Sequence, residues 1–134
     1  MKHVLAVDDE RNILRLVEVN LIRAGYRVTT AMDGQEALEK IAQDRPDIVV
    51  LDWMMPRVDG YTLLRRLRAN PETAELPVIM LTAKAQDKDI FAGWQAGADM
   101  YLPKPFNPSE LLTFVRKILE AGERSHDDPQ RIYM

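Results

Sequence analysis

Short apolar runs alternate with amphipathic stretches along most of the chain. The apolar runs predict five strands, at His3–Val7, Arg27–Ala31, Ile48–Leu51, Val78–Leu81 and Met100–Leu102. The third run has no polar residue in alternation, which is typical of a strand that is buried on both faces of a parallel sheet. The pattern therefore predicts a sheet that is enclosed by other elements.

Between these runs, apolar residues recur at helical spacing. The first stripe is formed by Ile13, Leu14, Val17 and Leu21, and Gly25 ends it. Four further helices are predicted: one from the capping-box sequence Asp33-Gly34-Gln35-Glu36, one from about Gly60 to before Pro71, one over about Asp87 to Ala96, and one from Asn107-Pro108-Ser109-Glu110. The last of these has an N-cap residue, a proline at the first helical position and an acidic third residue.

This strict alternation predicts an α/β fold, a doubly wound (βα)5 parallel five-stranded sheet with helices on both faces. We expect one domain over residues 1–121. Residues 122–134 are predicted to form a polar tail, because the stretch from Glu123 is polar and broken by Pro129. In such folds, ligands bind beyond the carboxyl ends of the strands.

Four of the five predicted strands are followed by residues whose side chains can bind ions or take part in reactions. Asp8-Asp9 follow the first strand, Asp52 the third, Thr82 the fourth and Lys104 the fifth. Three carboxylates at one sheet edge repel one another, and a divalent cation is the natural compensation. A carboxylate beside such a cation can act as an oxygen nucleophile toward phosphorus, which makes Asp52 the central candidate.

Composition limits the classes of function. The formal charge of −3 gives no general affinity for nucleic acid, and the absence of cysteine excludes disulfides and thiolate metal sites. The N-terminal apolar run is too short for a signal peptide, and no run approaches the roughly 20 residues that span a bilayer. We expect a soluble cytoplasmic protein that does not act on membranes or directly on nucleic acid.

With these residues named, the chain closely resembles the receiver domain of bacterial two-component response regulators, over about Met1 to Ala121. The matching motifs are Asp8-Asp9, Asp52 with Met55-Pro56 and Asp59-Gly60, Thr82-Ala83, Gly97-Ala98-Asp99 before Tyr101, and Lys104-Pro105-Phe106. Each motif is weak alone, but all of them in order are specific. The resemblance implies the flavodoxin-like strand order 2-1-3-4-5.

The resemblance also implies roles. Asp52 would accept a phosphoryl group from a sensor histidine kinase or a histidine phosphotransfer protein, so the chain would be a phosphorylated signalling protein and not an enzyme. Asp9, Asp52 and the Met54 carbonyl would bind Mg²⁺, with Mn²⁺ as an alternative, and Asp8 would act mainly through water. Thr82 and Lys104 would contact phosphoryl oxygens.

Further expectations concern the surroundings of this site. Ala83 would leave room for the phosphoryl group, Pro105 could form a cis bond, and Trp53 is predicted to line the pocket mouth. Tyr101 would be the switch aromatic, which turns inward as Thr82 moves; a packing tyrosine is the simpler alternative.

Two rivals from other classes fit less well. An aspartyl-nucleophile phosphatase needs an acid two residues after its nucleophile, where this chain has Met54. A flavin or nucleotide binder needs a phosphate loop after the first strand, where Asp8-Asp9-Glu10 would repel phosphate.

The output of the receiver is less constrained. We expect a stand-alone receiver that docks a protein partner through its fourth helix, fifth strand and fifth helix. The alternative is the receiver of a longer DNA-binding transcriptional regulator. Met100 and Phe114 stand where the winged-helix subgroup has charges that pair across a dimer, so a monomer or weak dimer is expected.

Overall fold

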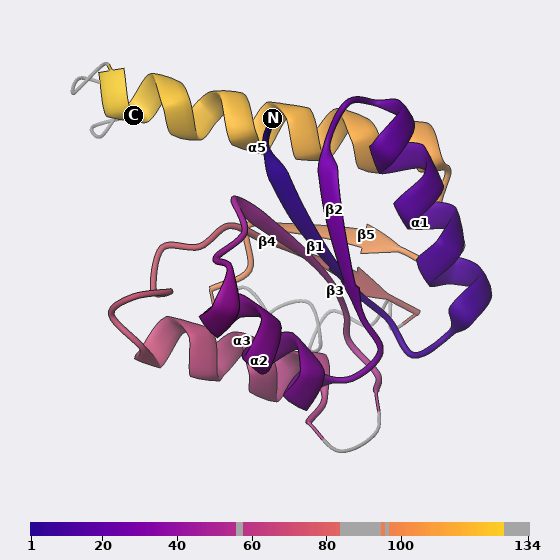
Figure 1. Cartoon of the computed structure of the whole chain (residues 1–134), viewed down its shortest axis with the longest axis horizontal. Helices are drawn as coiled ribbons and strands as arrows, with labels where there is room; N and C mark the ends of the chain where they lie inside the picture. Colours follow the sequence, from indigo (N-terminus) through magenta and orange to yellow (C-terminus); the bar gives the residue numbers. More distant parts are fainter. Residues whose placement is uncertain (56–57, 84–94, 96, 128–134) are drawn as a thin grey trace.

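A computed structural model describes residues 1–55, 58–83, 95 and 97–127 of the chain (Figure 1). Its centre is one five-stranded parallel sheet in the order β2-β1-β3-β4-β5. The strands are β1 His3–Val7, β2 Arg27–Ala31, β3 Ile48–Asp52, β4 Val78–Thr82 and β5 Met100–Pro103. The predicted sheet and its strand order are therefore confirmed.

Helices cover both faces of this sheet, as Figure 1 shows. The described helices are α1 Arg11–Arg23, α2 Gly34–Gln43, α3 Gly60–Ala69 and α5 Pro108–Asp127. Alternate residues of each central strand point to opposite faces, so the core divides into two clusters. Leu5 and Val49 pack on the α2–α3 side, whereas Val4 and Val50 pack on the α1–α5 side.

Local capping explains where several helices begin and end. The Asp33 carboxylate accepts from the Glu36 N–H at 2.8 Å, and the Asp59 carboxylate accepts from the Thr62 N–H at 2.8 Å. After α1, Gly25 adopts a φ of 98°, a left-handed conformation that glycine takes without steric cost. The predicted ends at these positions are confirmed.

The structure differs from the predicted pattern at some ends. Strands β3, β4 and β5 include Asp52, Thr82 and Pro103, which the pattern placed just outside. Helix α5 continues to Asp127, although a polar tail was predicted from residue 122. The next proline, Pro129, lies beyond Asp127, so no proline breaks the polar segment within the helix.

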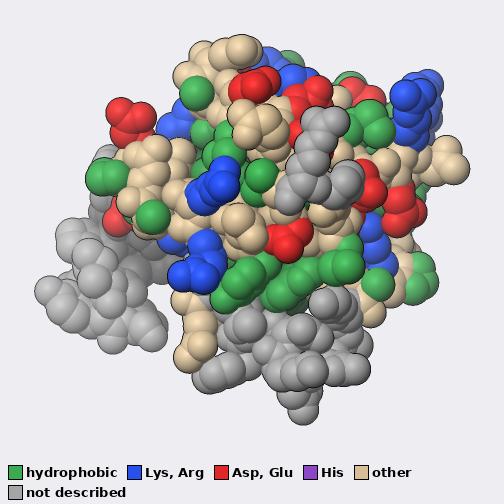
Figure 2. Space-filling view, turned by 90° about the horizontal axis from the view of Figure 1, so that it is seen from below, with side chains coloured by type: hydrophobic (Ala, Val, Ile, Leu, Met, Phe, Trp, Pro, Cys, Tyr) green, Lys and Arg blue, Asp and Glu red, His purple; other side chains and the backbone are tan. Residues whose placement is uncertain are grey.

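The predicted fourth helix lies almost wholly outside the described residues. On the face seen from below in Figure 2, acidic and basic side chains are interspersed, and several hydrophobic side chains gather in one group. None of the described helices is long and apolar enough to cross a membrane.

Candidate functional site

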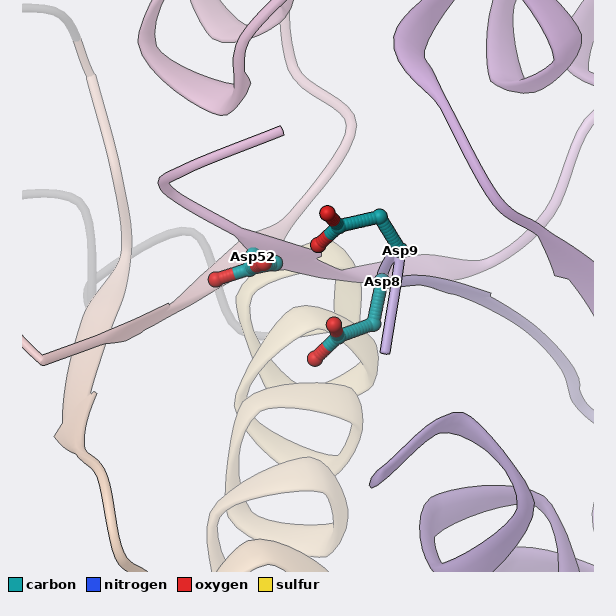
Figure 3. A group of neighbouring side chains, drawn as sticks. All are labelled: Asp8, Asp9 and Asp52. Atoms are coloured by element: carbon teal, nitrogen blue, oxygen red, sulfur yellow. The ribbon is translucent and has the colours of Figure 1, made fainter. Parts of the chain in front are cut away.

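The parallel register brings the predicted site residues to one edge of the sheet. Val7 of β1 pairs with Leu51 of β3, so Asp8 and Asp52 leave the sheet side by side. Thr82 ends β4 and its carbonyl accepts from the Lys104 N–H at 2.8 Å, which holds the β5 end beside it. The side chains of Asp8, Asp9 and Asp52 converge in Figure 3, although they come from two strands.

These three aspartates form a compact oxygen cluster. One carboxylate oxygen from each lies within 4.8 Å of the others. Asp8 and Asp52 are buried, and Asp9 is exposed, so the cluster opens to solvent on the Asp9 side. Hard oxygen donors that carry excess negative charge suit a cation such as Mg²⁺, and the donor set fits that ion.

Lys104 is the cationic partner of this cluster. Its ammonium lies 3.0 Å from the Asp8 carboxylate and 3.1 Å from the Asp52 carboxylate, with Glu10 at 3.8 Å. Burial works against its charge, but the hydrogen bond to Asp8 and the charges of Asp52 and Asp8 outweigh it, so the pKa of Lys104 is raised. Its pairing with Asp52 was predicted. Its contacts with Asp8 and Glu10 were not.

The electrostatics of the site disfavour the ionised form of Asp52. Burial raises the pKa of Asp52 to about 7, and the neighbouring Asp8 charge adds to the rise. Lys104 and a backbone hydrogen bond from Met54 act in the opposite direction without cancelling it. Near neutral pH the ionised form of Asp52 is therefore unfavourable, and a bound cation would stabilise it.

Because the ionised Asp52 carboxylate destabilises the native state, we expect Asp52→Asn to stabilise the protein. The pKa of Asp52 lies above its value in the unfolded chain, so the native state binds an extra proton between about pH 4 and pH 7. Stability should fall as the pH rises through this window. At pH 8 without divalent cations, we expect the variant to be more stable by about 2 kcal/mol in urea unfolding.

The same comparison at pH 5 provides the control. There the wild-type carboxyl is mostly protonated and resembles the amide, so the gap in the free energy of unfolding should shrink. A constant gap at both pH values would show that the charge on Asp52 is not its cause.

The Asp59-Gly60 motif has a structural role next to the site. A Cβ atom on Gly60 would lie 2.1 Å from the Asp52 carbonyl oxygen, so only glycine fits there. The Gly60 N–H also donates to the Trp53 carbonyl at 2.9 Å. The start of α3 therefore packs directly against the backbone that presents Asp52.

The remaining predicted groups lie around this cluster. Thr82 is buried at the end of β4, and the following Ala83 is exposed at the site edge. The Lys104–Pro105 peptide bond is cis, as predicted. Tyr101 lies on β5, half-buried against the α2–α3 side of the core, and burial raises its pKa to about 12.

Trp53 is not where the sequence analysis placed it. Its side chain is 7% exposed and belongs to the core, whereas it was predicted at the pocket mouth. Its ring stacks on Tyr61 and also contacts Tyr101. Sequence reasoning missed Tyr61, whose place on the first turn of α3, directly after Asp59-Gly60, was the available signal. Met54, two residues after Asp52, is exposed instead.

The comparison with known proteins agrees with this geometry. Residues 4–116 match the response regulator receiver domain. The chain belongs to this family. The receiver is 38% identical to the Vibrio cholerae chemotaxis protein CheY4, with a TM-score of 0.83, and the match covers 87% of this chain and 98% of that structure.

Two curated relatives extend the comparison. This receiver is 44% identical to the alkaline phosphatase synthesis transcriptional regulatory protein PhoP of Bacillus subtilis, over 91% of this chain and 50% of PhoP. It is also 44% identical to the DNA-binding dual master transcriptional regulator RpaA of Synechocystis, over 92% of this chain and 52% of RpaA. The chain thus spans about half the length of these relatives.

Proposed function

We propose that the chain is a phosphoacceptor, with Asp52 as the residue that receives a phosphoryl group from the phosphohistidine of a sensor kinase or phosphotransfer protein. The observation that carries the proposal is the convergence of Asp8, Asp9 and Asp52 beside the Lys104 ammonium. An oxygen of Asp52 forms the new bond to phosphorus, and the bond from phosphorus to the imidazole nitrogen breaks.

Each neighbouring residue supports this transfer in a distinct way. Asp9, Asp52 and the Met54 carbonyl would hold Mg²⁺, and Asp8 would act through water. The bound cation neutralises negative charge on the phosphoryl oxygens. The Lys104 ammonium, which lies 3.1 Å from the Asp52 carboxylate, would contact one of those oxygens, and Thr82 would contact another.

The transfer would then change the surface that a partner recognises. As Thr82 moves toward the phosphoryl group, Tyr101 is favoured in its inward position. The face that includes β5 and α5 would change with it and bind a downstream protein. Phosphate incorporation from acetyl phosphate, with and without Mg²⁺, tests the first half of this sequence directly.

Metal binding should distinguish the two N-terminal aspartates. We expect Asp9→Ala to weaken Mg²⁺ binding about a hundredfold and Asp8→Ala about tenfold, because Asp9 would be a direct ligand and Asp8 an outer one. Asp8 is also committed to Lys104 at 3.0 Å, whereas Asp9 is exposed to the entering ion. Calorimetric titration with MgCl₂ measures both, and equal losses would reject this division.

A second candidate is the receiver of a DNA-binding transcriptional regulator. It is favoured by the regulators PhoP and RpaA, of whose lengths this chain covers about half. An antibody against residues of α5 would measure the mass of the native protein in its own cells. A band about twice as large as this chain would support the second candidate, and a band at 15.4 kDa would support a stand-alone receiver.

A further inference from the structure

Three aromatic rings from separate parts of the fold, those of Trp53, Tyr61 and Tyr101, lie close together. Trp53, directly after Asp52, has its ring centroid 5.4 Å from that of Tyr61, with an angle of 28° between the planes. Its centroid also lies 6.3 Å from that of Tyr101, at an angle of 39°. The Trp53 ring therefore contacts both a tyrosine of α3 and the tyrosine of β5.

Two hydrogen bonds hold the backbone of Trp53. Its N–H donates to the Leu81 carbonyl at 2.9 Å, and its carbonyl accepts from Gly60. These bonds set where the indole starts but not how it is turned. Its orientation depends on the side chains packed around it, and Tyr61 supplies the stacked ring.

Tyr61 is itself held in place. It follows Gly60, whose close approach to Asp52 fixes the first turn of α3. The guanidinium carbon of Arg65, one turn later, lies 5.9 Å from the centre of the Tyr61 ring, within the range of a cation–π contact. Tyr61 is thus a partly buried, oriented ring between an exposed arginine and the buried tryptophan.

We infer that Tyr61 is a positioning residue for the Tyr101 switch: it fixes the Trp53 ring against which Tyr101 packs in its inward position. This inference rests on the proposed function, because it concerns the conformational response to phosphorylation. It adds a residue of α3 to a response otherwise assigned to Thr82 and Tyr101.

The position of Tyr101 and the affinity for a phosphoryl mimic are thermodynamically linked. If the mimic binds only the protein with Tyr101 inward, a variant that lowers the population of that state lowers the affinity for the mimic by the same factor. An aromatic pair of this geometry contributes enough for loss of the Tyr61 ring to weaken binding of the mimic about three- to tenfold. Replacement by phenylalanine keeps the ring and should keep the coupling.

The test is a titration with beryllofluoride in saturating Mg²⁺, followed by the amide signals of Tyr101 and Leu102. We expect Tyr61→Leu to raise the dissociation constant about three- to tenfold, with Tyr61→Phe close to wild type. Tyr26→Leu is the matched control, since Tyr26 is also half-buried but packs on the opposite side of the sheet. Mg²⁺ affinity without beryllofluoride should be the same in all four proteins.

Each other outcome is decisive. A wild-type dissociation constant in Tyr61→Leu, or an equal loss in Tyr61→Phe, would overturn the inference. A parallel loss of Mg²⁺ affinity would also overturn it, because Tyr61 would then be acting on the metal site. If Tyr61→Leu does not fold, Arg65→Gln replaces it, with a smaller loss expected and no loss contradicting the role. If the wild-type protein does not bind beryllofluoride, the proposed function is refuted instead.

Discussion

Asp52→Asn should abolish phosphate incorporation from acetyl phosphate. The amide cannot supply the anionic oxygen that forms the bond to phosphorus, and no other group at the sheet edge takes its place in the proposed chemistry. Intact-mass spectrometry in the presence of Mg²⁺ should show one added phosphoryl group on wild-type protein and none on the variant. Omitting Mg²⁺ should reduce the wild-type product to background, because the carboxylate cluster repels an anionic donor.

A matched variant guards against a general loss of structure. Asp47→Asn changes a carboxylate at the opposite end of β3, where Asp47 accepts from the His3 N–H at 2.7 Å. It should be phosphorylated like wild type. Full incorporation into Asp52→Asn would mean that another residue is the acceptor.

Lys104→Ala should separate phosphorylation from switching. The metal ligands and Asp52 remain, so slow phosphorylation should survive. The variant loses the ammonium that lies 3.0 Å from Asp8 and 3.1 Å from Asp52. In the phosphorylated state this ammonium would contact a phosphoryl oxygen. A contact made only in the phosphorylated state is needed to shift the population of the output face.

Amide chemical shifts of residues 87–101 with and without beryllofluoride measure this response. We expect Lys104→Ala to lose more than about nine-tenths of the wild-type shift, the population change that a charged contact can drive. Thr82→Ala should behave similarly, since Tyr101 would lose the movement that it follows. Lys117→Ala, an exposed lysine on α5, is the control. A complete shift in Lys104→Ala would place the coupling in other residues.

Much of this fold could be predicted because its pattern is local. An apolar run such as Ile48–Leu51 between helical patterns is typical of a strand in a covered parallel sheet, and Gly25 ends α1 for a reason visible in the sequence. The predicted end of α5 was wrong, and the reason is also physical. Polar composition was interpreted as a loose tail, yet polar residues without a breaker can continue a helix to Asp127.

The candidate site could be predicted only in outline. Strand ends place Asp8, Asp52 and Lys104 at one edge, so their proximity follows from topology. Which carboxylates Lys104 would pair with depends on register and side-chain reach, and its contact with Asp8 was missed. Trp53 was misplaced because its neighbours, Tyr61 and Tyr101, come from other elements and no sequence period links them.

The most direct measurement of the central claim is to locate the phosphoryl group. Borohydride reduces an aspartyl phosphate to homoserine, so protein treated with acetyl phosphate and Mg²⁺ can be reduced, digested and mapped by mass spectrometry. The account predicts homoserine at position 52 and aspartate at positions 8 and 9. Homoserine at either of those positions, or an unchanged Asp52 in protein that has gained phosphate, would contradict it.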